Sequence, residues 1–311
     1  MARPRFTDLT RELEPGPARP LGELLRELYP GASWGAVREL ARTGKVSVGG
    51  ELCTEPRELI PGGARVSVKM AAPGPRAARA AGVLLEYADG EVVVVHKPAG
   101  LSTVPFDERE RDTLDRRVRA ALERREHRRR DALGVVHRID KETSGLVVFA
   151  RTLAAKRHLE QQFRLHTVHR RYLALAHGRL ASQTFSSRLV ADRGDGLRGS
   201  TTNPRLGRTA TTHVRALEPL EGATLVECRL ETGRTHQIRI HLSEAGHPLL
   251  GERVYQRGYP GALIAAPRLM LHAAELGFIH PRTGAELRFS APPPEDLLGL
   301  RSALKAAPGA R

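Results

Sequence analysis

The stretch that decides the fold is VVHRIDKETSGLVVFAR, which runs from Val135 to Arg151. Its first half is polar and carries Arg138 and Asp140 two residues apart, and its second half, after Gly145, is a run of apolar residues. A short run of branched and aromatic residues predicts a buried β-strand. The pattern therefore predicts a carboxylate on a turn that leads directly into a rigid sheet, where catalytic groups are often mounted.

Working outward, strand-like runs outnumber helix-like runs from about residue 83 to the end of the chain. Strands are expected at 91–98, 146–151, 171–178, 209–219, 224–231, 268–278 and 286–292, and helices at 152–163, 235–245 and 295–306. Many of the strands follow one another without an intervening helix. We therefore expect residues 83–311 to form one α+β domain with a mixed, largely antiparallel sheet.

The N-terminal part has a different pattern. Leucines at helical spacing in LGELLRELYP predict a helix, and Ser33 is expected to cap a second helix that ends at Gly44. KVSVGGELC predicts a hairpin around Gly49-Gly50, and PGGARVSV at 61–68 predicts a second hairpin. We expect four parts in the chain: a loose arm (1–18), a small domain (19–69), a Pro/Gly/Ala/Arg linker (70–82) and the large domain (83–311).

The chain is strongly basic, with 50 Lys+Arg against 35 Asp+Glu among 311 residues and a formal net charge of +15. Such a charge attracts polyanions, either nucleic acid or an anionic membrane surface. With seven Phe, five Tyr and one Trp, rows of stacking rings are not expected, and contacts from Arg and Lys to phosphates are favoured. The densest charge run, Arg116 to Arg130, fits a solvated surface as well as it fits an RNA contact.

The sequence also argues against several classes of protein. The longest apolar run, Val92 to Val95, is far shorter than the roughly 20 residues of a membrane-spanning helix, and the N-terminal residues lack the apolar core of a secretion signal. Cys53 and Cys228 do not have the spacing of a zinc site. We therefore expect no metal, and we expect the protein to work in the reducing environment of the cytoplasm. The histidines that could suggest a metal site are expected to be structural: His137, His236 and His241.

The segment from His137 to Ala150 resembles the catalytic motif of the RluA-type RNA pseudouridine synthases, HRLDKxTSGLLLFA, with Ile139 in place of Leu. Four further stretches resemble segments of that family in the same order: Val94 to Pro105, Arg170 to Gly178, Leu230 to Tyr255 and Leu269 to Leu297. AVRELARTGKVSVGG in the N-terminal part resembles an S4 RNA-binding module. The resemblance covers most of residues 85–300 and implies an RNA-modifying isomerase that needs no cofactor.

The family's reaction breaks the bond between uracil N1 and ribose C1′ and rejoins the base through C5. The resemblance assigns the catalytic carboxylate to Asp140, which attacks C1′, adds to the base or assists elimination from the sugar. An aspartate of ordinary pKa, about 3.9, is ionised at neutral pH. In a closed pocket it needs a cation to remain so, and the resemblance gives that place to Arg234. It gives Tyr172 to the pocket face and to removal of the C5 proton.

The resemblance also implies residues that bind the RNA. Arg138 is expected to fill the space of the flipped uridine or to pair with its phosphate, because a base within a helix is out of reach of an active site. Ile238, four residues after Arg234 on an expected helix face, is expected to pack on the uracil plane. In the S4-like module, Arg38, Arg42 and Lys45 are expected to contact phosphates.

Two other functions fit parts of the pattern. A catalytically silent RNA-binding or ribosome-assembly factor would explain the charge and the S4-like module, although Asp140, Tyr172 and Arg234 would then have no role. A glycosidic-bond hydrolase needs two carboxylates across the bond, and Glu142 lies only two residues from Asp140 in the same turn. The expected partner is RNA, ribosomal rather than transfer RNA, and the expected state is a monomer.

Overall fold

The computed structural model describes residues 6–42, 45–53, 56–70, 83–126 and 133–305. The chain divides into two compact units, Met1–Ala80 and Ala81–Arg311. The linker expected at 70–82 lies outside the described residues except for Met70.

The part of the first unit that the structure describes has two helices and six strands, in a four-stranded and a two-stranded sheet, around its own core. Its elements are β1 (Leu9–Glu12), β2 (Arg19–Pro20), α1 (Leu21–Leu28), α2 (Trp34–Arg42), β3 (Val46–Val48), β4 (Glu51–Leu52), β5 (Leu59–Ile60) and β6 (Arg65–Val68). The main sheet has the order β1-β6-β3-β4, and β2 pairs with β5. The leucines expected on one face of α1 are buried against Val37 of α2 and Val46 of β3, and Ser33 Oγ accepts from Ala36 N at 3.2 Å, as a helix cap does.

Two expectations for this unit are wrong. The arm is not loose where it is described: β1 pairs antiparallel with β6, and Leu13 N donates to Ala64 O at 2.9 Å. The hairpin expected at 61–68 does not form, because β6 pairs with β1 and β3 while β5 pairs with β2. Gly62 instead packs so closely on the arm that a Cβ there would lie 2.3 Å from Gly16 N. Long-range pairing thus overrides the local turn pattern.

The second unit is built on one large sheet. Its strands are β7 (Leu85–Ala88), β8 (Val92–Lys97), β9 (Gly134–Val135), β10 (Ser144–Ala150), β11 (His169–His177), β12 (Gln183–Val190), β13 (Gly199–Thr201), β14 (Arg208–Leu220), β15 (Ala223–Leu230), β16 (Leu271–Ile279) and β17 (Glu286–Ser290). The order is β13-β12-β14-β15-β11-β16-β10-β8-β7, with β9 on β10 and β17 on β16. All the recorded pairings are antiparallel except that of β10 with β16. With the helices, this confirms the α+β fold.

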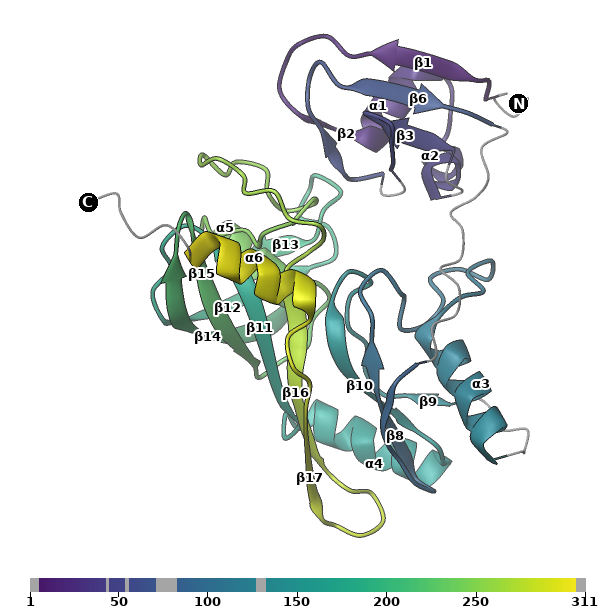
Figure 1. The fold of residues 1–311 in the computed structure, drawn as a ribbon, viewed down its shortest axis with the longest axis vertical. Coiled ribbons are helices and arrows are strands. Elements are labelled where there is room, and N and C mark those ends of the chain that lie inside the picture. Colours follow the sequence, from purple (N-terminus) through teal and green to yellow (C-terminus); the bar gives the residue numbers. More distant parts are fainter. Residues whose placement is uncertain (1–5, 43–44, 54–55, 71–82, 127–132, 306–311) are drawn as a thin grey trace. The chain divides into compact units, whose positions relative to one another are not determined.

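Helices α3 (Leu114–Glu126) and α4 (Leu153–Arg164) flank the part of the sheet that contains β8 and β10 (Figure 1). The other helices described in this unit are α5 (Gln237–Glu244) and α6 (Glu295–Lys305). α3 packs on the face that presents Val93 and Val95, and α4 packs on the face that presents Val92 and Val94. This two-sided burial is why the four valines are consecutive rather than alternating with polar residues.

Candidate active site

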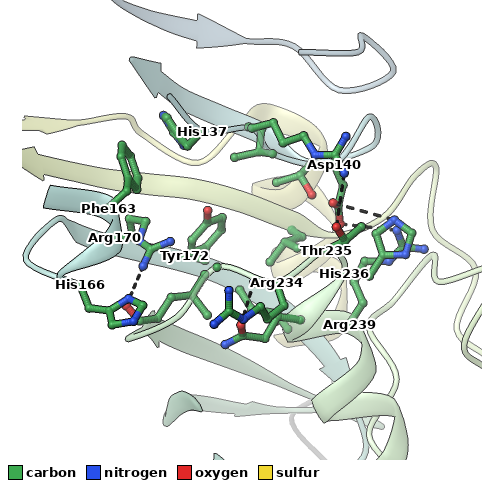
Figure 2. Close-up of a pocket in the computed structure, with 18 of the residues that line it drawn as sticks. His137, Asp140, Phe163, His166, Arg170, Tyr172, Arg234, Thr235, His236 and Arg239 are labelled. Carbon is green, nitrogen blue, oxygen red and sulfur yellow. Dashed lines mark hydrogen bonds and ion pairs between the residues drawn. The ribbon is translucent and has the colours of Figure 1, made fainter. Parts of the chain in front are cut away.

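A cavity of about 370 Å³ opens where the ends of several elements meet, and Figure 2 shows most of the side chains that line it. The segment between β9 and β10 forms one side, and β11, the end of α4 and the turn leading into α5 form the others. Five of the residues proposed from the sequence line it: Arg138, Asp140, Tyr172, Arg234 and Ile238. The volume lies in the range of small-molecule sites.

The turn that carries Asp140 is held by the segment after β8. The Thr143 N–H donates to Asp140 O at 3.0 Å, which closes the turn. The buried Lys97 ammonium donates to the carbonyls of Pro98, Leu101 and Lys141 at 2.7–2.9 Å. Burial lowers the pKa of Lys97 to about 7. The backbone of the turn that carries Asp140 is therefore held by Lys97, a residue that the sequence did not assign to the site.

Gly145 explains how the turn can enter the sheet so abruptly. Its φ of +118° is rarely adopted by other residues, and a Cβ would lie 2.2 Å from Ala273 O. Gly145 pairs with Ala273 in the parallel contact between β10 and β16. The close approach of these two strands brings the turn with Asp140 to the edge of the cavity.

The cation beside Asp140 is Arg239, and the expectation that Arg234 takes this place is wrong. Nη1 of Arg239 is 3.5 Å from Oδ2 of Asp140, whereas Nε of Arg234 donates to Thr209 O at 3.0 Å. Arg234 lies in the turn before α5, which begins at Gln237, and its main-chain N–H donates to the Gln237 side chain at 3.0 Å. Arg239 lies in the first turn of the helix and faces the carboxylate. Arg234 also does not share a helix face with Ile238.

Arg239 is anchored by a second carboxylate. Its Nε and Nη2 donate to Oε2 and Oε1 of Glu252 at 2.7 and 2.8 Å, and both side chains are buried. Burial disfavours the charged form of both side chains. For Arg239, the attraction of the Glu252 carboxylate outweighs burial and raises the pKa of the guanidinium. The guanidinium therefore stays protonated and keeps Nη1 directed toward Asp140. The sequence did not indicate the Arg239–Glu252 pair. The two residues are 13 positions apart, on α5 and on the loop after it, and only the fold brings them together.

A histidine completes the surroundings of Asp140. Nε2 of His236 is 3.9 Å from Oδ1 of Asp140, and its Nδ1 is 2.6 Å from the Tyr255 hydroxyl. Burial lowers the pKa of His236 to about 4, so the imidazole is neutral at physiological pH. Figure 2 shows His236 and Arg239 on the same side of Asp140.

Tyr172 forms part of the wall of the cavity, on β11. It is 8% exposed, and burial raises its pKa to about 12. The phenol is therefore protonated at neutral pH and has no standing negative charge with which to accept a proton. Ile238, 4% exposed, belongs to the same apolar cluster as Tyr172.

Arg138 lies at the rim. Its side chain is exposed, and Nη2 donates to Thr235 Oγ1 at 3.3 Å across the opening. The preceding His137 is fixed, because its Nε2 accepts from Val148 N at 3.0 Å and its ring stacks on Phe163 at 4.7 Å. Burial lowers the pKa of His137 to about 3, so this histidine is a neutral structural group.

The three residues proposed for the S4-like module lie in the first unit and do not line the cavity. Arg38 is exposed on α2, and Lys45 lies just before β3 and is partly exposed. Arg42 ends α2, and its side chain lies outside the described residues. Of the basic run at Arg116 to Arg130, the part up to Glu126 forms most of α3, whose Arg117 pairs with Asp112 at 2.6 Å, and residues 127–130 are not described.

Within the described residues, no group of three or more His, Cys, Asp or Glu is arranged to hold a metal ion. In the same part of the chain, no helix has the length and apolar character needed to cross a membrane.

Comparisons with known proteins identify the family of the chain. A family model described as RNA pseudouridylate synthase matches residues 91–244, which include Asp140, Tyr172 and Arg239. The chain is 38% identical to the ribosomal large subunit pseudouridine synthase D of Xanthomonas campestris, with 91% of this chain and 88% of that protein aligned. It is 37% identical to the uncharacterized RNA pseudouridine synthase YlyB of Bacillus subtilis, over 85% of this chain and 87% of that protein. Among solved structures, human RNA pseudouridylate synthase domain containing 4 has the same fold, with a TM-score of 0.57 and 22% identity over 69% of this chain and 90% of that one.

Proposed function

Because the chain belongs to the RNA pseudouridylate synthase family, we propose that it isomerises uridines in large-subunit ribosomal RNA, with Asp140 as the group that performs the chemistry. The chain is an RNA pseudouridine synthase and hence an isomerase. The choice of ribosomal RNA is supported by the names of its relatives, several of which are ribosomal large subunit enzymes.

The reaction conserves atoms and electrons. The N1–C1′ bond of uridine breaks, the base turns, and a C5–C1′ bond forms. The C5 proton then leaves and N1 gains one, so neither a redox partner nor water is consumed. The protein must bind the flipped base, stabilise the separated sugar and base, and move one proton.

The observation that carries the proposal is the ion pair of Asp140 with Arg239 at the cavity. When RNA fills the cavity and displaces water, an isolated carboxylate would tend to take up a proton. The fixed guanidinium of Arg239 opposes this and keeps the carboxylate available to the sugar or the base. A silent RNA-binding protein would have no use for this arrangement.

The other site residues then have distinct roles. We assign Tyr172 and Ile238 to the walls that hold the uracil ring. Tyr172 can accept the C5 proton only if its own proton leaves at the same time, because its raised pKa leaves no phenolate at neutral pH. We assign Arg138 to the space vacated by the flipped nucleotide and Arg234 to a neighbouring phosphate.

The first unit is proposed to be an S4-like module that binds RNA through the exposed side of α2 and the start of β3. Arg38, Arg42 and Lys45 would contact phosphates there, and this contact would add affinity without taking part in the chemistry. We further propose that the protein acts as a monomer in the cytoplasm, without a membrane partner; size-exclusion chromatography with light scattering tests the oligomeric state.

Tritium release from RNA labelled at uridine C5 tests the proposed function. Wild-type protein and Asp140→Asn are each incubated with ribosomal RNA and with transfer RNA from cells that lack the protein. Release from ribosomal RNA by the wild type alone supports the proposal. Release from transfer RNA instead would move the substrate to that class, and equal release by both proteins would remove Asp140 from the reaction.

A further inference from the structure

His236 has contacts to Asp140 and Tyr255 that none of the roles above explains. Nε2 lies 3.9 Å from Oδ1 of Asp140, and Nδ1 is hydrogen-bonded to the Tyr255 hydroxyl at 2.6 Å. Arg239 approaches the other carboxylate oxygen, Oδ2, at 3.5 Å. The two oxygens of Asp140 are thus approached by two different groups, one cationic and one neutral.

The backbone of His236 is held in an unfavourable conformation. Its φ of 59° and ψ of 20° lie in the left-handed region, and among the described residues only His166 is another non-glycine with positive φ. Conformations of this kind persist where the surroundings impose them, and they concentrate at functional sites. Here the strained residue immediately precedes α5, and its position places the imidazole between Asp140 and Tyr255.

Tyr255 is itself fixed. It is 4% exposed, Ser243 Oγ donates to its carbonyl oxygen, and its N–H donates to Glu252 Oε1 at 3.3 Å. The guanidinium of Arg239 lies over its ring, 5.2 Å from the centre. The hydroxyl is therefore presented to His236 from a rigid support that is shared with the Arg239–Glu252 pair.

The charges around His236 favour one of its two neutral tautomers. The groups that act on it are Asp140, Arg239, Glu252 and Arg198, together with the Tyr255 hydroxyl. The ionised carboxylate of Asp140 has no proton to donate, so a favourable contact with Nε2 requires that nitrogen to carry the proton. Nδ1 then carries no proton, and its lone pair can accept a hydrogen bond from the Tyr255 O–H.

We propose that Tyr255 and His236 are positioning residues for Asp140: the Tyr255 hydroxyl donates to Nδ1 and so holds the His236 proton on Nε2, where it serves the Oδ1 atom of the catalytic carboxylate. This inference rests on the proposed function, in which Asp140 performs the chemistry. Both separations from Asp140 exceed a hydrogen bond, so the carboxylate has room to move toward the nucleotide. Such contacts commonly tighten only when substrate is bound.

Three variants separate positioning from structural effects. Tyr255→Phe removes only the hydroxyl. His236→Asn keeps a residue that tolerates the left-handed backbone but is too short to reach Asp140. His236→Gln restores an amide donor near the Nε2 position. Tyr259→Phe is the matched control, because it removes the same atom four residues from Tyr255, where the ring contacts His177 instead.

The measurements are single-turnover tritium release, RNA affinity, thermal unfolding, and the ¹⁵N–¹H spectrum of the histidine side chains, in which the His236 signal is assigned by its loss in His236→Gln. We expect His236 to show the Nε2–H tautomer, and Tyr255→Phe to show a mixture of both. We expect the single-turnover rate to fall roughly tenfold in Tyr255→Phe and His236→Asn, the size of one lost hydrogen bond to a charged group. His236→Gln should recover most of the rate, Tyr259→Phe should match the wild type, and RNA affinity should not change.

The rate–pH curve gives a readout that a purely structural role would not move. A carboxylate deprived of a donor is protonated at higher pH, so the acid limb should shift upward in His236→Asn but not in His236→Gln. An Nδ1–H tautomer in the wild type, or wild-type rates in both Tyr255→Phe and His236→Asn, would overturn the proposal. Failure of the proposed function looks different, because the wild type itself would then release no tritium.

Discussion

Arg239 lies between two carboxylates and serves them differently: it binds Glu252 through two hydrogen bonds of 2.7 and 2.8 Å, and it presents its remaining terminal nitrogen to Asp140 at 3.5 Å. The short bonds fix the guanidinium, and the longer contact acts on the Asp140 carboxylate, the proposed catalytic group. Glu252 thus helps to determine where the positive charge meets Asp140, although no contact joins the two carboxylates directly.

The first prediction compares the two arginines. Arg239→Lys should lower the single-turnover rate by about a hundredfold, because one ammonium cannot both replace the bidentate bond to Glu252 and reach Asp140. Arg234→Lys makes the same chemical change at the residue bound to Thr209 O, and it should alter RNA affinity more than the rate. A larger loss of rate in Arg234→Lys than in Arg239→Lys would contradict this assignment.

The second prediction concerns the point at which the turn that carries Asp140 enters the sheet. Gly145→Ala should destabilise the protein by more than about 3 kcal/mol, because its Cβ would overlap Ala273 O and its φ would be strained. Gly299→Ala is the control, in α6 with open space around it, and should stabilise by roughly 0.5–1 kcal/mol. Urea denaturation measures both, and an unchanged midpoint in Gly145→Ala would be inconsistent with the observed strand approach.

The third prediction concerns Lys97. Lys97→Met should cost roughly 3 kcal/mol of stability, because the carbonyls of Pro98, Leu101 and Lys141 lose a shared donor inside the protein. Activity should fall as well, since Lys141 O belongs to the turn of Asp140. Lys156→Met removes a partly exposed ammonium that pairs only weakly with Glu160, at 3.7 Å, and should leave both properties nearly unchanged. Denaturant titration and tritium release are the measurements, and equal stability of the two variants would refute the role of Lys97.

The fourth prediction is a pH dependence of stability. In the unfolded chain, His137 becomes protonated below its ordinary pKa of 6.5. In the folded protein, burial lowers the pKa of His137 to about 3, so the ring stays neutral until the pH falls to that value. The unfolded state therefore binds more protons in this window, and the free energy of unfolding should fall as pH decreases from 6.5 toward 3. His137→Gln keeps an acceptor for Val148 N but does not titrate, so it should flatten this fall. Urea titrations of the wild type and His137→Gln at several pH values provide the comparison, and equal slopes in the two proteins would contradict the prediction.

The fifth prediction tests the first unit. Arg38→Glu should weaken RNA binding and reduce the slope of its salt dependence, because a phosphate contact releases counterions. The single-turnover rate at saturating protein should stay at the wild-type value. Arg11→Glu, which makes the same change on exposed β1, is the control. If both variants bind like the wild type across a salt series, α2 does not contact RNA.

The sequence determined much of the architecture through local patterns. The apolar run after Gly145 became β10, and the helix expected at 152–163 became α4, capped by Thr152 Oγ1 on Ala155 N at 3.0 Å. Asp140, Tyr172 and Arg138 were proposed from linear motifs and meet at one cavity. Side-chain periodicity, caps and turn residues act over a few positions, so they can be read from the chain directly.

Only the tertiary structure decided which groups act on one another. Arg239 and not Arg234 faces Asp140 because Arg234 is bound to Thr209 O on a distant strand, and the support of Arg239 by Glu252 depends on the return of the chain after α5. The pairing of the N-terminal arm with β6 and the burial that raises the pKa of Tyr172 also arise from distant segments. The physical reason is the same in each case: ion pairing and desolvation depend on separations of a few ångströms between residues far apart in sequence, which no local pattern encodes.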